Sequence, residues 1–357
     1  MAVFAADLMA RYLRAYPDDD VSLLSGPEQS DSLELVRSQS APSVLRTYDP
    51  DVVLIQYAHG MYGADTDALV DVVRQVESPT VVTLHHVGFP ADPRAALIPV
   101  LTAAADAVVV LSAEAGRRLT EGLGCTTDKV TLIPHGVDLP AVPSSRAEAR
   151  RALGVPRHGP VLSTFGLLRP AKGIIEALKV VAAARQEFPS MRYVIAGDTH
   201  PGDPEGRTGY RRALRDTIAE LGLNETVQMI ERFLRPDEID VLLTASDVSL
   251  LPYRRLDQTT SGPLLRAAAA GTPFFATPFT HATELSREGA GVVDPLRSPD
   301  DAASRLCHLL RDTTTLRHMG RRARVLAERH AWPRVVKSYR DVFCRLLRRL
   351  PPLKERS

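Results

Sequence analysis

Short apolar runs alternate with helix-like segments along almost the whole length of the 357-residue chain. The runs are rich in β-branched side chains, are bounded by polar residues, glycine or proline, and are too short for helices. In the first half we therefore predict strands at 21–24, 52–57, 80–84, 107–111 and 130–134. In the second half we predict strands at 161–166, 193–197, 227–230, 248–253, 273–277 and 291–294.

The segments between these runs predict helices near 64–76, 93–104, 112–122, 174–188, 208–221, 236–245, 263–270 and 332–347. The strand runs are continuously apolar, which is typical of parallel sheets with both faces covered. The predicted fold class is therefore α/β, with two doubly wound parallel-sheet, Rossmann-like domains joined around LPAVPSSRAEA at 139–149. In such domains ligands bind beyond the carboxyl ends of the strands, where helices begin.

Composition excludes several classes of function. Hydrophobic residues make up 44% of the chain and charged residues 24%, and the formal net charge is +1, as in an ordinary soluble protein. The near-zero charge argues against a nucleic-acid binder. No apolar run reaches the roughly 18–20 residues of a membrane span, and no signal peptide opens the chain. The three scattered cysteines lack metal-ligand spacing, so we expect no metal site and a cytoplasmic protein.

Two turns of the second half have features of anion sites. After the strand at 161–166, Gly166 permits a tight exit and Lys172 stands where the next helix begins, with Arg169 nearby. The alternative is a solvated basic turn, an interpretation that suits Arg169 better than Lys172. In DQTTSGPLLRAAAAG, at 257–271, Ser261 can cap a helix and Gly262 lets another group come close. A helix start of this kind attracts anions.

Polar residues also follow other strands. Asp198 and His200 lie in a long loop rich in glycine and proline after the strand at 193–197, where they either bind a ligand or stabilise the loop. In the first half, His59, His85 and His135 follow three separate strands. A neutral imidazole can donate to a hydroxyl or accept its proton near neutral pH. Three such loops in one domain favour a site more than a single histidine does, although each could satisfy a buried carbonyl.

The motifs TLHHV, IPHGV, FGLLRPAKG, AGDTHP followed by GYR, LPYRRLDQTTSGPL and ATPFTHATEL occur in this order along the chain. In this combination, from about residue 2 to about residue 345, the chain resembles bacterial glycosyltransferases of family 4, which have the GT-B fold. The resemblance implies two domains facing across a cleft and a last helix that crosses back to the first domain. Their implied bounds are 1–140 for acceptor binding, 141–330 for nucleotide-sugar binding, and 331–357 for the crossover helix and tail.

The resemblance also implies an activity. The expected enzyme is a metal-independent, retaining hexosyltransferase that needs no cofactor besides its co-substrate, a UDP- or GDP-linked nucleotide-diphosphate sugar. Its other partner would be a sugar or small-molecule acceptor. No feature of the sequence specifies the base, the sugar, the acceptor or the oligomeric state.

Site residues follow from the matching motifs. Lys172 would bind the donor diphosphate, and the amides of Ser261, Gly262 and Leu264 would lie beside the phosphates and sugar. Gln258 would contact the transferring sugar. The remaining implied donor-site residues are Gly166, Arg169, Asp198, His200 and Arg266. His85 would lie near the sugar and acceptor, with His59 and His135 on the acceptor side.

Three departures from the family pattern stand out. Gln258 and Arg266 replace the two glutamates of the Glu–seven residues–Glu motif, as in a subgroup with the same GLL…KG and Q-x-xSG signatures. Gln258 can still bond sugar hydroxyls, and Arg266 could reach a phosphate bidentately. Leu167 stands where many relatives carry an arginine, so Arg169 could substitute. The family's first strand and glycine-rich loop are missing from this sequence, so we expect roughly 20–35 upstream residues, enough for that strand and loop, in the natural protein.

Other functions stay open at this point. The missing glutamates permit a non-catalytic relative that binds a nucleotide or a partner glycosyltransferase without transferring sugar. A sugar-nucleotide epimerase of the same fold would form product without an acceptor. A dinucleotide oxidoreductase is disfavoured because no G-x-G-x-x-G motif follows any predicted strand.

Overall fold

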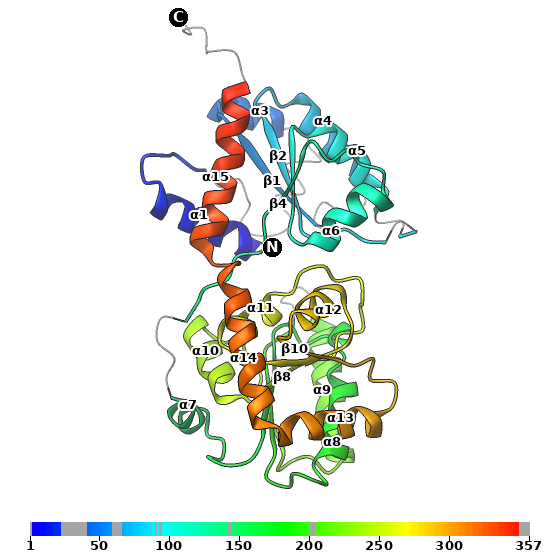
Figure 1. Cartoon of the computed structure of the whole chain (residues 1–357). Helices are drawn as coiled ribbons and strands as arrows, with labels where there is room; N and C mark the ends of the chain where they lie inside the picture. The colour runs from blue at the N-terminus through cyan, green and yellow to red at the C-terminus, as the bar shows by residue number, and fades with distance from the viewer. Residues whose placement is uncertain are drawn as a thin grey trace, which may run out of the picture. The chain divides into compact units, whose positions relative to one another are not determined.

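The computed structural model describes residues 2–22, 41–58, 66–89, 91–92, 95–140, 145–199 and 204–349 (Figure 1). The chain divides into two compact units. Unit 1 comprises Met1–Gly136 together with His330–Ser357, and unit 2 comprises Val137–Arg329. The last helix, α15 (Trp332–Arg349), therefore belongs to the unit formed by the start of the chain. Among the described residues no helix has both the length and the apolar character needed to cross a bilayer.

Unit 1 contains a four-stranded parallel sheet in the order β1-β2-β3-β4. Its strands are β1 (Val53–Tyr57), β2 (Thr80–Leu84), β3 (Ala107–Val110) and β4 (Val130–Leu132). Neighbouring positions of β2 face opposite sides: Val82 packs with helices α4 (Thr66–Gln75) and α5 (Leu97–Ala104), and Val81 packs with α1 (Ala2–Ala15) and α15. Both faces are thus covered, which explains the unbroken apolar runs.

The remaining elements of unit 1 are short. They are α3 (Ala41–Tyr48), α6 (Ala113–Arg117) and the π-helical turn η2 (Arg118–Gly122), which continues α6. Ser112 caps α6 by accepting a hydrogen bond from the Ala115 amide, at 3.1 Å.

Unit 2 contains a six-stranded parallel sheet in the order β10-β9-β8-β5-β6-β7. Its strands are β5 (Val161–Phe165), β6 (Arg192–Ala196), β7 (Val227–Ile230), β8 (Val248–Leu251), β9 (Phe274–Ala276) and β10 (Gly291–Val293). The chain builds outward from β5 to one edge, then returns to β8 and builds to the other. This reversal creates a topological switch point between the carboxyl ends of β5 and β8, where ligands of such folds bind.

Helices cover both faces of this sheet. One face packs against α8 (Ile174–Ala184), α9 (Pro204–Glu220) and α13 (Pro299–Arg311). The other carries α7 (Arg146–Leu153), α10 (Pro236–Ala245), α11 (Gly262–Ala269), α12 (Thr280–Arg287) and α14 (Thr313–Glu328). The α/β prediction of two Rossmann-like domains is therefore confirmed.

Three local predictions were wrong. Val21 and Ser22 are not in a strand, and the other two residues of that predicted strand lie outside the described residues. Residues 146–149 of the predicted linker form the start of α7, because Ser145 and Glu148 make a reciprocal capping box. Helix α9 begins at Pro204, a residue tolerated in a first turn, so the preceding loop is shorter than predicted.

Candidate functional site

The strand exits of β5 and β6 lie against each other in unit 2. Gly166 and Gly197 have φ angles of 126° and 149°, which only glycine adopts readily. A Cβ at Gly197 would collide with the carbonyl oxygen of Gly166, so the close approach requires glycine. A Cβ at Gly166 would lie 3.6 Å from Cγ of Pro263, in the first turn of α11. The turn after β5 and the start of α11 are therefore neighbours, as the switch point requires.

Lys172 belongs to the segment that follows β5 and packs on the exit of β8. It ends the 3₁₀ turn η3 (Pro170–Lys172), and Gly173 follows in the left-handed conformation with a φ of 64°. A side chain at Gly173 would collide with the Pro252 carbonyl, so this turn packs directly on the exit of β8. The Arg254 amide also donates to the Ala171 carbonyl, at 3.0 Å. In this arrangement the Lys172 ammonium lies 3.7 Å from the centroid of the Tyr253 ring.

Tyr253 connects this lysine to the start of α11. The tyrosine is buried, stacks on Phe279 with ring centroids 4.7 Å apart, and places its hydroxyl 3.2 Å from Oγ of Ser261. Ser261 caps α11, and its Oγ accepts a hydrogen bond from the Leu264 amide. A cation and a helix N-terminus, both favourable for an anion, are thus joined through one aromatic side chain.

Two of the three amides that we expected beside the donor phosphates, at the start of α11, are hydrogen-bonded within the protein. The Ser261 amide donates to Nδ1 of the buried His281, at 2.9 Å, and the Leu264 amide donates to Ser261 Oγ, at 3.3 Å. Both amides therefore already donate to acceptors of the protein, and these hydrogen bonds stabilise the loop before α11. Among the described residues no acceptor contacts the Gly262 amide, and the space beside its Cα is open. Gly262 is the position at which a ligand can approach the helix start.

Arg266 has a structural partner. Its Nη2 donates to the Asp240 carboxylate and to the Pro236 carbonyl of α10, each at 2.9 Å. Burial raises the pKa of Asp240, while Arg266 acts in the opposite direction. The idea that Arg266 reaches a phosphate is not supported by this geometry, since its guanidinium joins α11 to α10. The sequence did not indicate Asp240 because it lies on a different helix.

The other predicted donor-site residues have varied surroundings. The Gln258 side-chain amide donates to the Thr260 carbonyl, at 2.7 Å, and so shapes its own loop. Asp198 forms an ion pair with Arg211 of α9 and accepts from the Thr199 amide. Arg169 is exposed on the surface of unit 2. His200 lies outside the described residues.

In unit 1, the rings of His85 and His135 both lie close to the ring of Phe4. The Phe4 ring centroid is 4.8 Å from that of His85 and 4.7 Å from that of His135. His85 Nε2 is 2.7 Å from Gln56 Oε1, and His135 Nδ1 is 2.8 Å from the Gly136 carbonyl oxygen. Since both partners are acceptors, each imidazole donates from the named nitrogen and keeps the other as an acceptor. His59 lies outside the described residues.

Both imidazoles are neutral at physiological pH. Burial, followed by the nearby His135, lowers the pKa of His85 to about 3. Burial is also the main cause that lowers the pKa of His135 to about 4, with His330 contributing and the Gly136 hydrogen bond opposing it. A neutral imidazole of this kind can orient a hydroxyl without adding charge.

Family models match both parts of the chain. Residues 145–326 match the model described as glycosyl transferases group 1, and residues 11–140 match glycosyltransferase family 4. The chain belongs to the group 1 glycosyltransferases. The resemblance stated from the motifs is thereby confirmed.

Curated relatives of this glycosyltransferase are D-inositol 3-phosphate glycosyltransferases. The Nocardia farcinica protein is 30% identical over 238 residues, which cover 65% of this chain and 51% of the relative. The Geodermatophilus obscurus protein is 30% identical over 262 residues, covering 71% of this chain and 56% of the relative. This chain thus spans about half the length of the curated relatives that it matches.

Solved structures share the fold. Sucrose-phosphate synthase from Thermosynechococcus elongatus has a TM-score of 0.73 at 19% identity, covering 92% of this chain and 83% of that protein. Anabaena Alr3699/HepE in complex with UDP has a TM-score of 0.70 at 20% identity, covering 85% and 82% of the two chains. These likenesses and the two parallel sheets assign the GT-B fold to this glycosyltransferase.

Sequence reasoning missed two supporting residues of unit 2. Tyr253 was treated as the end of an apolar strand run, and its side chain instead underlies Lys172. His281 lies in the quoted motif ATPFTHATEL but received no role, although it accepts the Ser261 amide. Both residues lie in motifs quoted from the sequence, LPYRRLDQTTSGPL and ATPFTHATEL, but the contacts that give them a role join separate segments.

Proposed function

We propose that this chain is a retaining glycosyltransferase that moves a sugar from a nucleotide-diphosphate sugar to an acceptor hydroxyl. The observation that carries the proposal is the position of Lys172 over Tyr253, whose hydroxyl lies 3.2 Å from Oγ of Ser261 at the start of α11. A fixed ammonium and a helix N-terminus suit the diphosphate of such a donor. The families matched by both parts of the chain agree with this chemistry.

Each part of the proposed site has a role in the transfer. The bond between the sugar C1 and the diphosphate oxygen breaks, and a bond between C1 and the acceptor oxygen forms. Lys172 stabilises the negative charge that develops on the departing diphosphate, an effect that is often the largest in such sites. The acceptor proton passes to a phosphate oxygen. Gln258 orients sugar hydroxyls, and His85 orients the sugar or acceptor as a neutral imidazole.

UDP is the nucleotide that we propose first. The Anabaena protein of the same fold is described in complexes with UDP and with UDP-glucose, and GDP is the second choice. For the acceptor, the names of the curated relatives make D-inositol 3-phosphate the first compound to test. No metal or other cofactor enters the proposal.

Thermal unfolding with UDP, GDP, ADP and dTDP tests the donor assignment. At a concentration 100 times its dissociation constant, a ligand adds about 2.7 kcal/mol to the stability of the unit that binds it. For a unit of this size the transition should rise by roughly 5–10 °C with one base and not with the others. A cooperative transition that none of the four nucleotides shifts would contradict the donor site.

Transfer itself requires a second experiment. The chain is incubated with the nucleotide sugar that binds and with candidate acceptors, and the anomeric configuration of the product is read by NMR. Retention of configuration supports the proposal, whereas inversion refutes a retaining mechanism. Nucleotide binding without transfer to any acceptor would favour the non-catalytic alternative, which the replacement of both motif glutamates by Gln258 and Arg266 keeps relevant.

A further inference from the structure

Unit 2 contains a cavity of about 350 Å³. It lies at the amino ends of the strands, whereas the proposed donor site lies at their carboxyl ends. Asp247, at its wall, directly precedes β8, and Pro273 directly precedes β9, so the cavity is at the amino ends of these strands. The charged residues that line it are Arg146, Asp247, Arg317, Arg321 and Arg324. Nothing in the proposed transfer reaction uses this group of residues.

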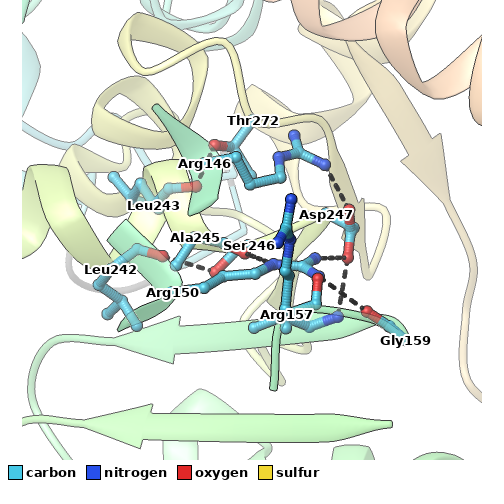
Figure 2. Close-up of polar contacts among 11 residues, drawn as sticks. Arg146, Arg150, Arg157, Gly159, Leu242, Leu243, Ala245, Ser246, Asp247 and Thr272 are labelled. Atoms are coloured by element: carbon cyan, nitrogen blue, oxygen red, sulfur yellow. Dashed lines mark hydrogen bonds and ion pairs between the residues drawn. The ribbon is translucent and has the colours of Figure 1, made fainter. Parts of the chain in front are cut away.

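The single carboxylate of the cavity is already neutralised. Asp247 forms ion pairs with Arg146 and with Arg150, whose Nη2 is 2.6 Å from the carboxylate, and it accepts the Val161 amide at 2.8 Å (Figure 2). Arg150 is buried and also donates to the carbonyls of Arg157 and Gly159. Arg146 and Arg150 thus share one carboxylate, so these three side chains together keep a net positive charge, and Asp247 does not compensate the arginines of α14.

Three of these guanidinium groups come from one face of α14. Arg317, Arg321 and Arg324 are spaced i, i+4 and i+7, and none of them has an acidic partner within the part of the chain that the structure describes. Like charges at this spacing repel one another and weaken a helix. Arg146, from α7, lines the same space as these three arginines, so positive charge from two helices gathers at one cavity.

The backbone around the cavity is closely packed. A Cβ at Gly320 of α14 would collide with the carbonyl oxygen of Gly271, so only glycine lets the helix lie this close to the end of α11. Leu316 and Ala323, one turn to either side, are buried. The arginines of α14 therefore project from a backbone whose position is fixed by contact, which favours a preformed anion site.

We propose that this cavity binds a small, soluble, phosphate-bearing molecule at a site separate from that of the sugar donor. Guanidinium groups bind phosphate oxygens bidentately, and several of them together favour an anion with more than one negative charge. A volume of about 350 Å³ suits a small molecule. The recess is lined by four segments of unit 2, and its arginines come from α7 and α14, which favours a free phosphate compound over the headgroups of a membrane surface.

Calorimetric titration of the full chain with inorganic pyrophosphate tests this proposal. The double variant Arg317→Gln/Arg321→Gln removes two cavity charges. The matched control Arg287→Gln/Arg322→Gln removes two exposed charges of α12 and α14 that do not line the cavity. We expect binding to this site to weaken at least tenfold in the first variant and less than twofold in the control. Equal pyrophosphate binding by the two double variants, or no binding by the original chain, would overturn the proposal.

Two further measurements separate this cavity from other sources of binding. The Lys172→Gln variant alters the proposed donor site, so it should leave the arginine-dependent pyrophosphate binding unchanged even if the donor assignment fails. Sedimentation with phosphatidylcholine vesicles that contain phosphatidic acid tests the headgroup alternative. We expect no binding that depends on Arg317 and Arg321 in this assay. Arginine-dependent vesicle binding without pyrophosphate binding would contradict a soluble ligand.

Discussion

The ammonium group of Lys172 lies 3.7 Å from the centre of the Tyr253 ring. This is well within the roughly 6 Å over which a ring face attracts a cation. Because Tyr253 is buried and stacked on Phe279, it forms a fixed support, and the flexible lysine stem loses less entropy when it meets an anion. Two substitutions of Tyr253 can therefore test whether its ring positions Lys172.

Replacing Tyr253 by leucine should weaken nucleotide binding more than replacing it by phenylalanine. Leucine removes the ring under Lys172, whereas phenylalanine removes only the hydroxyl that lies near Ser261. From a cation–π interaction of about 1 kcal/mol we expect the UDP dissociation constant to rise roughly fivefold in Tyr253→Leu and less than twofold in Tyr253→Phe. Calorimetry measures both. Equal losses would show that the ring does not position the lysine.

Arg266 should stabilise the fold without contributing to nucleotide affinity. Its guanidinium is paired with Asp240, and the two side chains are 18% and 35% exposed. A double-mutant cycle of Arg266→Met and Asp240→Ala should give a coupling free energy of about 1 kcal/mol in urea unfolding. The UDP dissociation constant of Arg266→Met should change less than twofold. A tenfold loss of affinity would instead place Arg266 on the ligand.

The stability of unit 1 should fall as the pH drops below about 6.5. The folded-state pKa of His85, about 3, is below the value of an unfolded histidine, so the unfolded chain binds the proton first. The stability associated with neutral His85 is therefore complete above pH 6.5 and is lost as the pH falls towards 3. Between pH 6.5 and pH 5 this histidine alone should cost about 1.5 kcal/mol.

The single tryptophan, Trp332, is a convenient probe because it is buried in unit 1 close to Phe4. Urea unfolding is followed by its fluorescence at pH 6.5 and pH 5 in the original chain and in His85→Gln. We expect the variant to lose about 1.5 kcal/mol less than the original chain over this interval. Identical pH slopes would mean that His85 is not buried as a neutral group.

Arg150 should be among the most costly arginines of unit 2 to replace. It is 6% exposed and donates to Asp247 and to the carbonyls of Ala245, Arg157 and Gly159 (Figure 2). Arg150→Met removes these hydrogen bonds and takes the buried partner from Asp247, whose side chain is 15% exposed, so we expect a loss of about 3 kcal/mol. The exposed neighbour Arg151 provides the control, and Arg151→Met should change stability by less than about 0.5 kcal/mol. Comparable calorimetric losses in both variants would contradict this role.

The sheets could be predicted from the sequence because their strands are buried on both faces. Runs such as 80–84 read as strands without help from distant residues, and the end of β5 at Phe165 lies within one residue of the prediction. Helix boundaries that depend on a capping residue were harder to predict from the sequence. Helix α7 was not predicted because its sequence, RAEARRAL, is short and arginine-rich, and its start is marked by the Ser145–Glu148 capping box.

The sequence located the candidate site, but the contacts that support its residues could not be predicted from the sequence. The motifs pointed to Lys172 and to the start of α11, because glycine and proline at strand exits have local meanings. The support from Tyr253 and the ion pair between Arg266 and Asp240 depend on tertiary contacts between separate elements. Such contacts are not encoded in the spacing of any one segment.

The most direct test of the account is the effect of Lys172→Gln on UDP binding and sugar transfer. Lys179→Gln is the matched control. Lys179 is exposed on α8, and its replacement removes the same charge from the same unit. If Lys172 stabilises the departing diphosphate, its replacement should lower turnover by about 10²-fold or more while Lys179→Gln stays within twofold. A Lys172→Gln variant that keeps UDP affinity and turnover within about threefold would contradict the proposed donor site.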